Sequence, residues 1–231
     1  MMKVHHSRSY PLLSALLFFF FVSWSASGSL LSIWLHQEIR LKAGDTGIIY
    51  SVLSISALFA QICYGFIQDK LGLRKHLLWY LTVMLILSGP AFLLFEYLLK
   101  VNILLGSVFG GIFIGLTFNG GIGVLESFTE RVARQCQFEF GKARMWGSLG
   151  WAVATFFAGL LFNIDPKLNF AVASCSGLMF MVLLARLRVS SAAHAMQEAV
   201  AGGKVTLQDA LRLLTLPRFW AMVFFVVGTC I

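Results

Sequence analysis

Six long apolar runs, separated by short polar connections, dominate the sequence. They cover residues 11–35, 47–67, 77–98, 103–129, 142–163 and 168–186. The hydrocarbon core of a bilayer is about 30 Å thick, and about 20 residues of helix are needed to cross it. Because backbone N–H and C=O groups find no water there, each run must satisfy its own hydrogen bonds as a helix. The sequence therefore predicts an all-α integral membrane protein with a bundle of six transmembrane helices at 11–186.

The composition excludes the main alternatives to a membrane protein. Hydrophobic residues make up 58% of the 231 residues and charged residues only 12%, whereas a soluble chain carries about 25% charged residues. A water-soluble fold of this size could not hide so much apolar surface. Disorder, a fibrous repeat and nucleic-acid binding are equally poor explanations, although the net charge is +8.

The distribution of Lys and Arg explains the positive charge and predicts the orientation. If residues 1–10 lie in the cytoplasm, thirteen of the eighteen basic residues fall in cytoplasmic segments and four in outer segments. Cytoplasmic loops of membrane proteins carry such an excess of positive charge. We therefore expect a cytoplasmic N-terminus. The one basic residue left over, Arg144, lies inside an apolar run.

The two ends of the chain carry further predictions. The first apolar run is about 25 residues long, which exceeds the apolar core of a signal peptide and favours a retained first helix. Residues 187–217 are predicted to form a cytoplasmic linker, in which the amphipathic stretch 205–216 is either an interfacial helix or plain linker. Residues 218–231 begin with Arg-Phe-Trp and are too few to span, so we expect the truncated start of a seventh helix.

No pattern in the chain indicates an enzyme or a metal site. The four cysteines are scattered, without a CxxC pair or a Cys/His cluster at metal spacing. We find no paired nucleophile and base, and no phosphate-binding loop. The sequence thus predicts neither catalysis nor a cofactor.

The connection between the second and third runs carries a motif, GFIQDKLGLRK at residues 65–75. Gly65 is expected to let two helices approach closely, and Gly72 to permit a tight turn. Asp69 can accept hydrogen bonds at a helix N-terminus or pair with a basic side chain, and so latch a gate. Lys70 and Arg74 belong to the same motif, although simple anchoring of the helix ends explains them as well. The pattern resembles the signature of the major facilitator superfamily.

Two ionisable residues, Glu126 and Arg144, lie within the fourth and fifth runs. Such residues are costly in a membrane and indicate function. If the two helices form an antiparallel hairpin about a loop centred near residue 135, Glu126 should lie at the depth of Arg144, and Asn119 at the depth of Trp151. One helix face then carries Asn119, Ile122 and Glu126, and the facing one carries Arg144, Gly147, Ser148 and Trp151.

These groups suit a sugar. A guanidinium can donate to two neighbouring hydroxyls, a carboxylate accepts from hydroxyls, and an indole offers a flat apolar face to a pyranose ring. The small residues Gly147 and Ser148 are expected to leave room for that ring. An exporter of lipophilic cations fits less well, because Arg144 would repel its substrate. The remaining alternative is that Glu126 and Arg144 pair at the cytoplasmic interface without binding anything.

From about Phe18 onward the chain resembles the oligosaccharide:proton symporters of the major facilitator superfamily, which include the lactose, raffinose, melibiose and sucrose permeases. The stretches that carry the resemblance are IWL at 33–35, DTGI at 45–48, GFIQDKLGLRK at 65–75, ESFTE at 126–130 and FEFGKARMWGSLGWA at 138–152. Within this family, Ser23-Trp24-Ser25 and Trp146-Gly147-Ser148 favour the sucrose permeases.

The resemblance implies roles for particular residues. It assigns sugar recognition to Glu126 and Arg144 and stacking on the sugar to Trp151. Further candidate contacts are Asn119, Ile122, Ser148, Phe21 and Trp24. It also implies proton coupling without a cofactor, alternating access, and a location in the bacterial cytoplasmic (inner) membrane.

Family members have twelve helices, and their proton-coupling residues belong to the second half. We therefore expect this chain to be the sugar-recognising N-terminal half of a disaccharide symporter, with sucrose as one such substrate. Its partners would be the sugar, the bilayer and a missing C-terminal half. The alternative is a transport-inactive fragment that needs a separate C-terminal half.

Overall fold

The computed structural model describes residues 3–71, 75–187 and 220. The chain divides into two compact units, Met1–Ser190 and Ser191–Ile231, and the helices described below belong to the first. The predicted linker and seventh helix, with the amphipathic stretch 205–216, lie outside the described residues except for Leu187 and Trp220. The helical elements are α1 (Lys3–Gly28), α2 (Leu31–Gln37), α3 (Ala43–Leu71), α4 (His76–Ile86), α5 (Ser88–Val101), α6 (Ile103–Ile114), the π-helix η1 (Gly115–Gly120), α7 (Gly121–Cys136), α8 (Phe140–Phe162) and α9 (Pro166–Arg186).

The lengths of the apolar helices confirm an all-α membrane protein. Five helical stretches in the described residues are long and apolar enough to cross a bilayer: Ser9–Gln37, Ala43–Lys70, Ile103–Cys136, Phe140–Phe162 and Pro166–Arg186. The pair α4 and α5 passes the same test together, with a bend of 55° between them. With this pair counted as one span, the described residues contain the six spans that the apolar runs predict.

The third span is bent rather than continuous, and Pro90 explains the bend. Proline has no N–H to donate and its ring clashes with the preceding turn, so it kinks a helix inside an apolar run. Ser174 of α9 compensates for the interruption: its hydroxyl donates to the Ile86 carbonyl at 2.8 Å and accepts from the Gly89 N–H at 2.8 Å. The side chain of a neighbouring helix thus satisfies backbone groups that the bend releases.

The fourth span contains a π-helical turn, η1, which keeps a row of glycines against α3. Gly111, Gly115 and Gly120 all lie against α3, where an added Cβ would come within 3.0 Å of its atoms. Two of these approaches are to backbone: 2.9 Å to the Leu53 nitrogen from Gly111, and 2.9 Å to the Ala57 nitrogen from Gly115. In a regular α-helix, the next residue on the same face as Gly115 would be residue 119. The π turn adds one residue to the helical turn, so Gly120 lies on that face instead.

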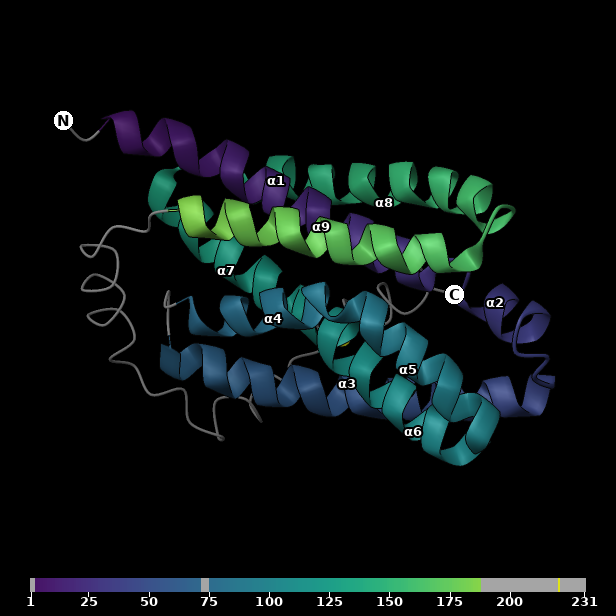
Figure 1. The fold of residues 1–231 in the computed structure, drawn as a ribbon. Helices are drawn as coiled ribbons and strands as arrows, with labels where there is room; N and C mark the ends of the chain where they lie inside the picture. Colours follow the sequence, from purple (N-terminus) through teal and green to yellow (C-terminus); the bar gives the residue numbers. More distant parts are fainter. Residues whose placement is uncertain (1–2, 72–74, 188–219, 221–231) are drawn as a thin grey trace. The chain divides into compact units, whose positions relative to one another are not determined.

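The helices form two layers (Figure 1). In one layer α1 packs along both α8 and α9, and in the other α3 packs along α6 and η1, with α5 against α6. The bent pair α4 and α5 contacts α9 and so joins the layers. The fourth and fifth spans follow each other across a short turn as predicted, but they pack together only sparsely: α8 lies chiefly against α1, and α7 is a minor neighbour.

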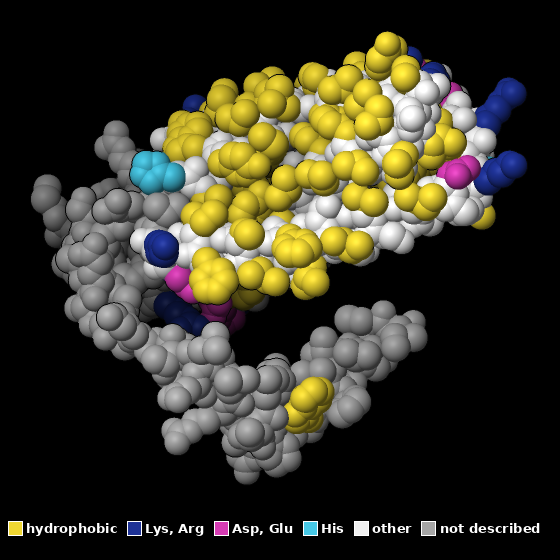
Figure 2. Space-filling view, turned by 90° about the horizontal axis from the view of Figure 1, so that it is seen from below, with side chains coloured by type: hydrophobic (Ala, Val, Ile, Leu, Met, Phe, Trp, Pro, Cys, Tyr) yellow, Lys and Arg dark blue, Asp and Glu magenta, His cyan; other side chains and the backbone are white. Residues whose placement is uncertain are grey.

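The outer faces are suited to lipid. Large apolar side chains of α3 point outward, and Phe59 and Phe66 are 65% and 69% exposed. Figure 2 shows hydrophobic side chains spread across the middle of one face, with charged side chains gathered toward its two ends. An apolar band between charged ends matches the cross-section of a bilayer.

Candidate functional site

Glu126 and Arg144 form an ion pair that joins α7 to α8. The Arg144 Nε–H donates to Glu126 Oε1, and each side chain is 32% exposed. The predicted pairing is confirmed, although the loop lies later than expected. Since α7 ends at Cys136 and α8 begins at Phe140, the turn is centred near residue 138 rather than 135. The rule that residues equally far from the loop lie opposite one another does not hold here. It requires two closely packed antiparallel helices, and α7 and α8 pack together only sparsely.

The Arg144 guanidinium is held on three sides. Besides its bond to Glu126, its Nη1–H donates to the Ser148 hydroxyl at 3.3 Å. Its Cζ lies 4.4 Å from the centre of the Phe21 ring, which is a cation–π contact. Within the described part of the chain, Nη2 makes no hydrogen bond. This nitrogen can therefore donate to a bound molecule.

Trp151 belongs to a cluster of aromatic rings that includes Phe21, the ring against which Arg144 lies. Its ring centre is 5.2 Å from that of Trp24 and 6.3 Å from that of Phe21, both in edge-to-face geometry. Trp24 in turn stacks on Phe118 of η1 at 6.4 Å. Phe21 is only 5% exposed and Trp24 is half-buried, so both face the protein interior rather than lipid. Phe118 was not foreseen, because nothing in its sequence context distinguishes it from other apolar helix residues.

A hydroxyl network fixes the backbone at Trp151. The Ser25 hydroxyl donates to the Trp151 carbonyl at 3.1 Å and lies 2.7 Å from the Thr155 hydroxyl. Thr155 also donates to the Trp151 carbonyl, at 2.9 Å. These hydrogen bonds link α1 to α8 next to the aromatic cluster. The Ser23-Trp24-Ser25 stretch thus contributes to the site through both an indole and a hydroxyl.

The expectation that Gly147 leaves room for a ligand is wrong. A Cβ on Gly147 would lie 2.8 Å from Phe21 Cδ2 and 2.9 Å from Cε2. The ring of Phe21 already occupies the space beside this glycine. Ser148 is exposed and acts as the partner of Arg144.

Asn119 and Ile122 belong to the same stretch of the fourth span but have other neighbours. The Asn119 carbonyl accepts from Gln61 Nε2 at 3.3 Å, which links η1 to α3. Ile122 is half-buried on α7. Among the described residues, neither makes a polar or ring contact with Arg144 or Trp151. It is the neighbouring Phe118 that reaches the aromatic cluster.

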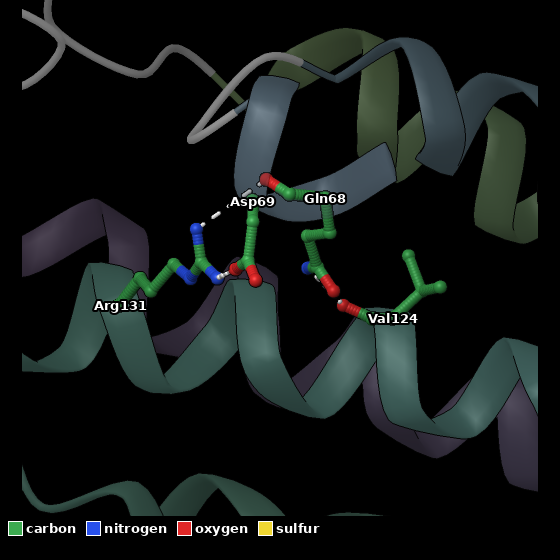
Figure 3. Close-up of polar contacts among 4 residues, drawn as sticks. All are labelled: Gln68, Asp69, Val124 and Arg131. Carbon is green, nitrogen blue, oxygen red and sulfur yellow. Dashed lines mark hydrogen bonds and ion pairs between the residues drawn. The ribbon is translucent and has the colours of Figure 1, made fainter. Parts of the chain in front are cut away.

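The motif after the second span contains a polar clamp between α3 and α7 (Figure 3). Asp69 pairs with Arg131 at 2.8 Å, and Arg131 Nη1 also reaches the Gln68 carbonyl at 3.5 Å. The Gln68 side chain, which is buried, donates to the Val124 carbonyl at 2.9 Å. The prediction that Asp69 pairs with a basic side chain is confirmed. Sequence reasoning missed its partner, because Arg131 lies two spans away.

Other parts of the motif differ from expectation. Gly65 does not mediate a close approach to any described residue, since an added Cβ would meet nothing within 4 Å. Lys70 is exposed at the end of α3, while Gly72 and Arg74 lie outside the described residues. Lys75 is half-buried, its Nζ donates to the Leu187 carbonyl beyond α9, and burial lowers its pKa. It therefore does more than anchor a helix end.

A search of residues 3–71 and 75–187 finds no group of three or more His, Cys, Asp or Glu side chains placed to hold a metal ion. In the same ranges Cys63 and Cys175 are free thiols.

The apolar spans mark a multi-pass membrane protein. The chain belongs to the LacY proton/sugar symporter family, whose sequence model matches residues 2–231. The description of this family is that of proton-coupled sugar symporters.

Named relatives agree with this assignment. The sucrose permease of Escherichia coli is 40% identical over 95% of this chain and 52% of its own length. The lactose permease of Citrobacter freundii is 41% identical over 85% of this chain and 48% of its own length. The raffinose permease of Escherichia coli is 37% identical over 98% of this chain and 54% of its own length. These relatives are permeases and not enzymes. The chain spans about half the length of the curated relatives it matches.

Proposed function

We propose that this chain is the sugar-recognising half of a proton-coupled oligosaccharide permease, with a disaccharide such as sucrose as substrate. The observation that carries the proposal is the set of contacts around the Arg144 guanidinium. Three neighbours hold its guanidinium and one nitrogen keeps its donors available, and the Phe21 ring against it also contacts the indole of Trp151. The similarity to permeases named for sucrose, lactose and raffinose supports a sugar of this size.

The proposed roles follow from the chemistry of each group. Arg144 Nη2 donates to sugar hydroxyls, and the second carboxylate oxygen of Glu126 accepts from them. Trp151 offers an apolar face to the C–H side of a pyranose ring. The two charges already neutralise each other, which lowers the cost of holding them within the membrane. Asn119, Ile122, Ser148, Phe21 and Trp24 are proposed to complete the surroundings of the sugar.

The ion pair suits alternating access, in which the two halves of a complete transporter move around a shared site. Glu126 belongs to α7 and Arg144 to α8, so one sugar can be held by two helices at once. The clamp of Asp69 and Arg131 is proposed to latch the cytoplasmic gate together with Gly65, Lys70, Gly72 and Arg74. The Lys and Arg distribution supports a cytoplasmic N-terminus, and the bacterial relatives support the inner membrane.

Proton coupling is proposed for the complete transporter, with the coupling residues in a C-terminal half that acts as the partner of this chain. The roughly 50% coverage of the relatives supports this arrangement. The second candidate is a transport-inactive fragment that becomes active only with such a half. Both candidates assign the same sugar-binding groups to α7 and α8.

A chimeric permease tests the proposal. In it, this chain replaces the matching half of the Escherichia coli sucrose permease, and cells without sucrose uptake are assayed with radiolabelled sucrose, lactose and raffinose. We expect uptake of at least one sugar, and a loss of tenfold or more in Arg144→Ala and Glu126→Gln. Lys142→Ala is the matched control, since this exposed lysine pairs only with Glu139 among the described residues. Unimpaired uptake by Arg144→Ala would rule out the assigned roles.

Two further arms separate the alternatives. Competition by a lipophilic cation but by no sugar would point to a drug exporter instead. The chain expressed alone should show no uptake if it needs a C-terminal half, and co-expression of that half should then restore uptake.

A further inference from the structure

Phe21 of α1 contacts both groups that the proposed function places on the sugar. Its ring lies 4.4 Å from Arg144 Cζ and packs edge-to-face against Trp151 at 6.3 Å. We propose that Phe21 is a positioning residue, which sets the plane of the Arg144 guanidinium for sugar binding and does not itself touch the sugar. This inference rests on the proposed function and replaces the direct sugar contact that the family resemblance suggests for Phe21.

The burial of Phe21 argues against direct contact. The Phe21 residue is 5% exposed, whereas the side chains of Arg144 and Glu126 are each 32% exposed. A sugar that enters from solvent therefore meets the ion pair and not the phenylalanine ring. The ring lies on the inner side of the guanidinium, where a π face attracts a cation.

The neighbours of Arg144 each occupy a different part of its guanidinium group. Glu126 takes Nε, Ser148 takes one Nη1 donor, and the Phe21 ring covers one face. An arginine side chain is long and flexible, and ordering it costs conformational entropy that a rigid aromatic support reduces. With the ring in place, Nη2 is aimed before the sugar arrives.

Gly147 is the counterpart that makes this arrangement possible. A Cβ there would lie 2.8 Å from Phe21 Cδ2, 2.9 Å from Cε2 and 3.3 Å from Arg144 Nη1. Gly147 follows Arg144 by three residues and so shares its helix face. The ring sits on the bare backbone of α8, under the guanidinium, and any side chain at 147 would displace the ring or the cation. Glycine at this position therefore serves the seating of Phe21.

Chemical modification of Arg144 tests the positioning role without any sugar. Membranes that contain the chain are treated with phenylglyoxal, and the adduct at Arg144 is quantified by peptide mass spectrometry. We expect Phe21→Leu and Gly147→Ala to raise the modification rate about threefold or more, because a loosened guanidinium reacts more readily. Phe21→Tyr keeps the ring face and should restore the wild-type rate. Phe19→Leu, on the same helix but without a ring contact to the site, should leave the rate unchanged.

The double variant Phe21→Leu with Gly147→Ala sharpens the test. If Gly147 acts by seating the ring, the double variant should react no faster than Phe21→Leu alone. Additive effects would overturn the link between the two residues. Should Phe21→Leu fail to accumulate in membranes, Phe21→Met, which also lacks a ring, takes its place. A Phe21→Leu rate equal to that of wild type would overturn the proposal.

Transport by the chimeric permease supplies the second readout. We expect Phe21→Leu to raise the KM for sugar about fivefold to thirtyfold, the range that a cation–π contact of moderate strength supplies, with little change in maximal rate. A raised KM with an unchanged modification rate would show that Phe21 touches the sugar, contrary to the proposal. If the wild-type chimera takes up no sugar, the proposed function fails, and the modification rates still decide whether Phe21 positions Arg144.

Discussion

Arg144 on α8 donates to Glu126 on α7, and each of the two side chains is 32% exposed. A fully buried pair would be closed to a bound molecule, and a fully exposed pair would contribute little to stability. The half-exposed pair keeps its charges compensated within a membrane span and still presents donors and acceptors to solvent.

The first prediction concerns the geometry of the cation. Arg144→Lys keeps the charge and can still pair with Glu126. A single ammonium group cannot also donate to Ser148, lie on the Phe21 ring and offer a planar fork to a sugar. We expect sugar affinity in the chimeric permease to fall tenfold or more, measured by equilibrium binding of radiolabelled sucrose.

A charge exchange controls for the ion pair itself. The double variant Glu126→Arg with Arg144→Glu retains the opposite charges and should keep the thermal unfolding temperature within a few degrees. It should nevertheless bind no sugar, since donor and acceptor have changed sides. Full sugar binding by the exchanged pair would show that geometry around Arg144 is unimportant.

The second prediction concerns the glycine row of the fourth span. Gly115→Val would drive a side chain into the backbone of α3, because even a Cβ lies 2.9 Å from the Ala57 nitrogen. Overpacking of this kind costs about 1–3 kcal/mol. The unfolding temperature of the detergent-solubilised chain, followed by near-UV circular dichroism, should fall clearly. Gly123→Val is the matched control, since a Cβ there meets nothing within 4 Å; an equal loss in both variants would contradict this explanation.

The third prediction concerns the bend in the third span. Ser174→Ala leaves the Ile86 carbonyl and the Gly89 N–H without their partner, at a cost of about 1 kcal/mol. In a Pro90→Ala background the new N–H can bond the Ile86 carbonyl within the helix, so the same change should cost less. Thermal unfolding of the four variants in a double-mutant cycle measures this coupling.

The control for the third prediction is Ser54→Ala. The Ser54 hydroxyl is exposed and donates only within its own helix, to the Tyr50 carbonyl. We expect its loss to change the unfolding temperature very little. A strictly additive cycle at Ser174 and Pro90 would mean that the serine does not serve the bend.

The fourth prediction concerns the clamp between α3 and α7. Asp69 is 75% exposed, so its pair with Arg131 should contribute under about 1 kcal/mol to stability. Asp69→Asn should therefore leave the unfolding temperature nearly unchanged and yet reduce sugar uptake by the chimeric permease severalfold, if the clamp acts as a latch. Exchange of the two charges, Asp69→Arg with Arg131→Asp, should recover uptake in part. A stable variant with undiminished uptake would remove the latch from the mechanism.

Several features of the site could be predicted from the sequence. An ionisable residue inside an apolar run is conspicuous, so the hydropathy pattern is enough to single out Glu126 and Arg144. Asp69 is equally conspicuous in its short motif. The role of Gly147 could not be predicted in the same way: a glycine indicates missing volume but does not say which neighbour fills it, and here the neighbour is Phe21.

The sequence by itself determined the number of spans, their approximate positions and the residues that bear charge, because a bilayer of fixed thickness turns a one-dimensional pattern of hydropathy into helices. Only the tertiary structure decided the partners: Arg131 for Asp69, Ser174 for the bend at Pro90, and Phe21 for Arg144. Those contacts depend on the tilt and rotation of each helix, which are set by packing against neighbours rather than by the hydropathy of the segment itself.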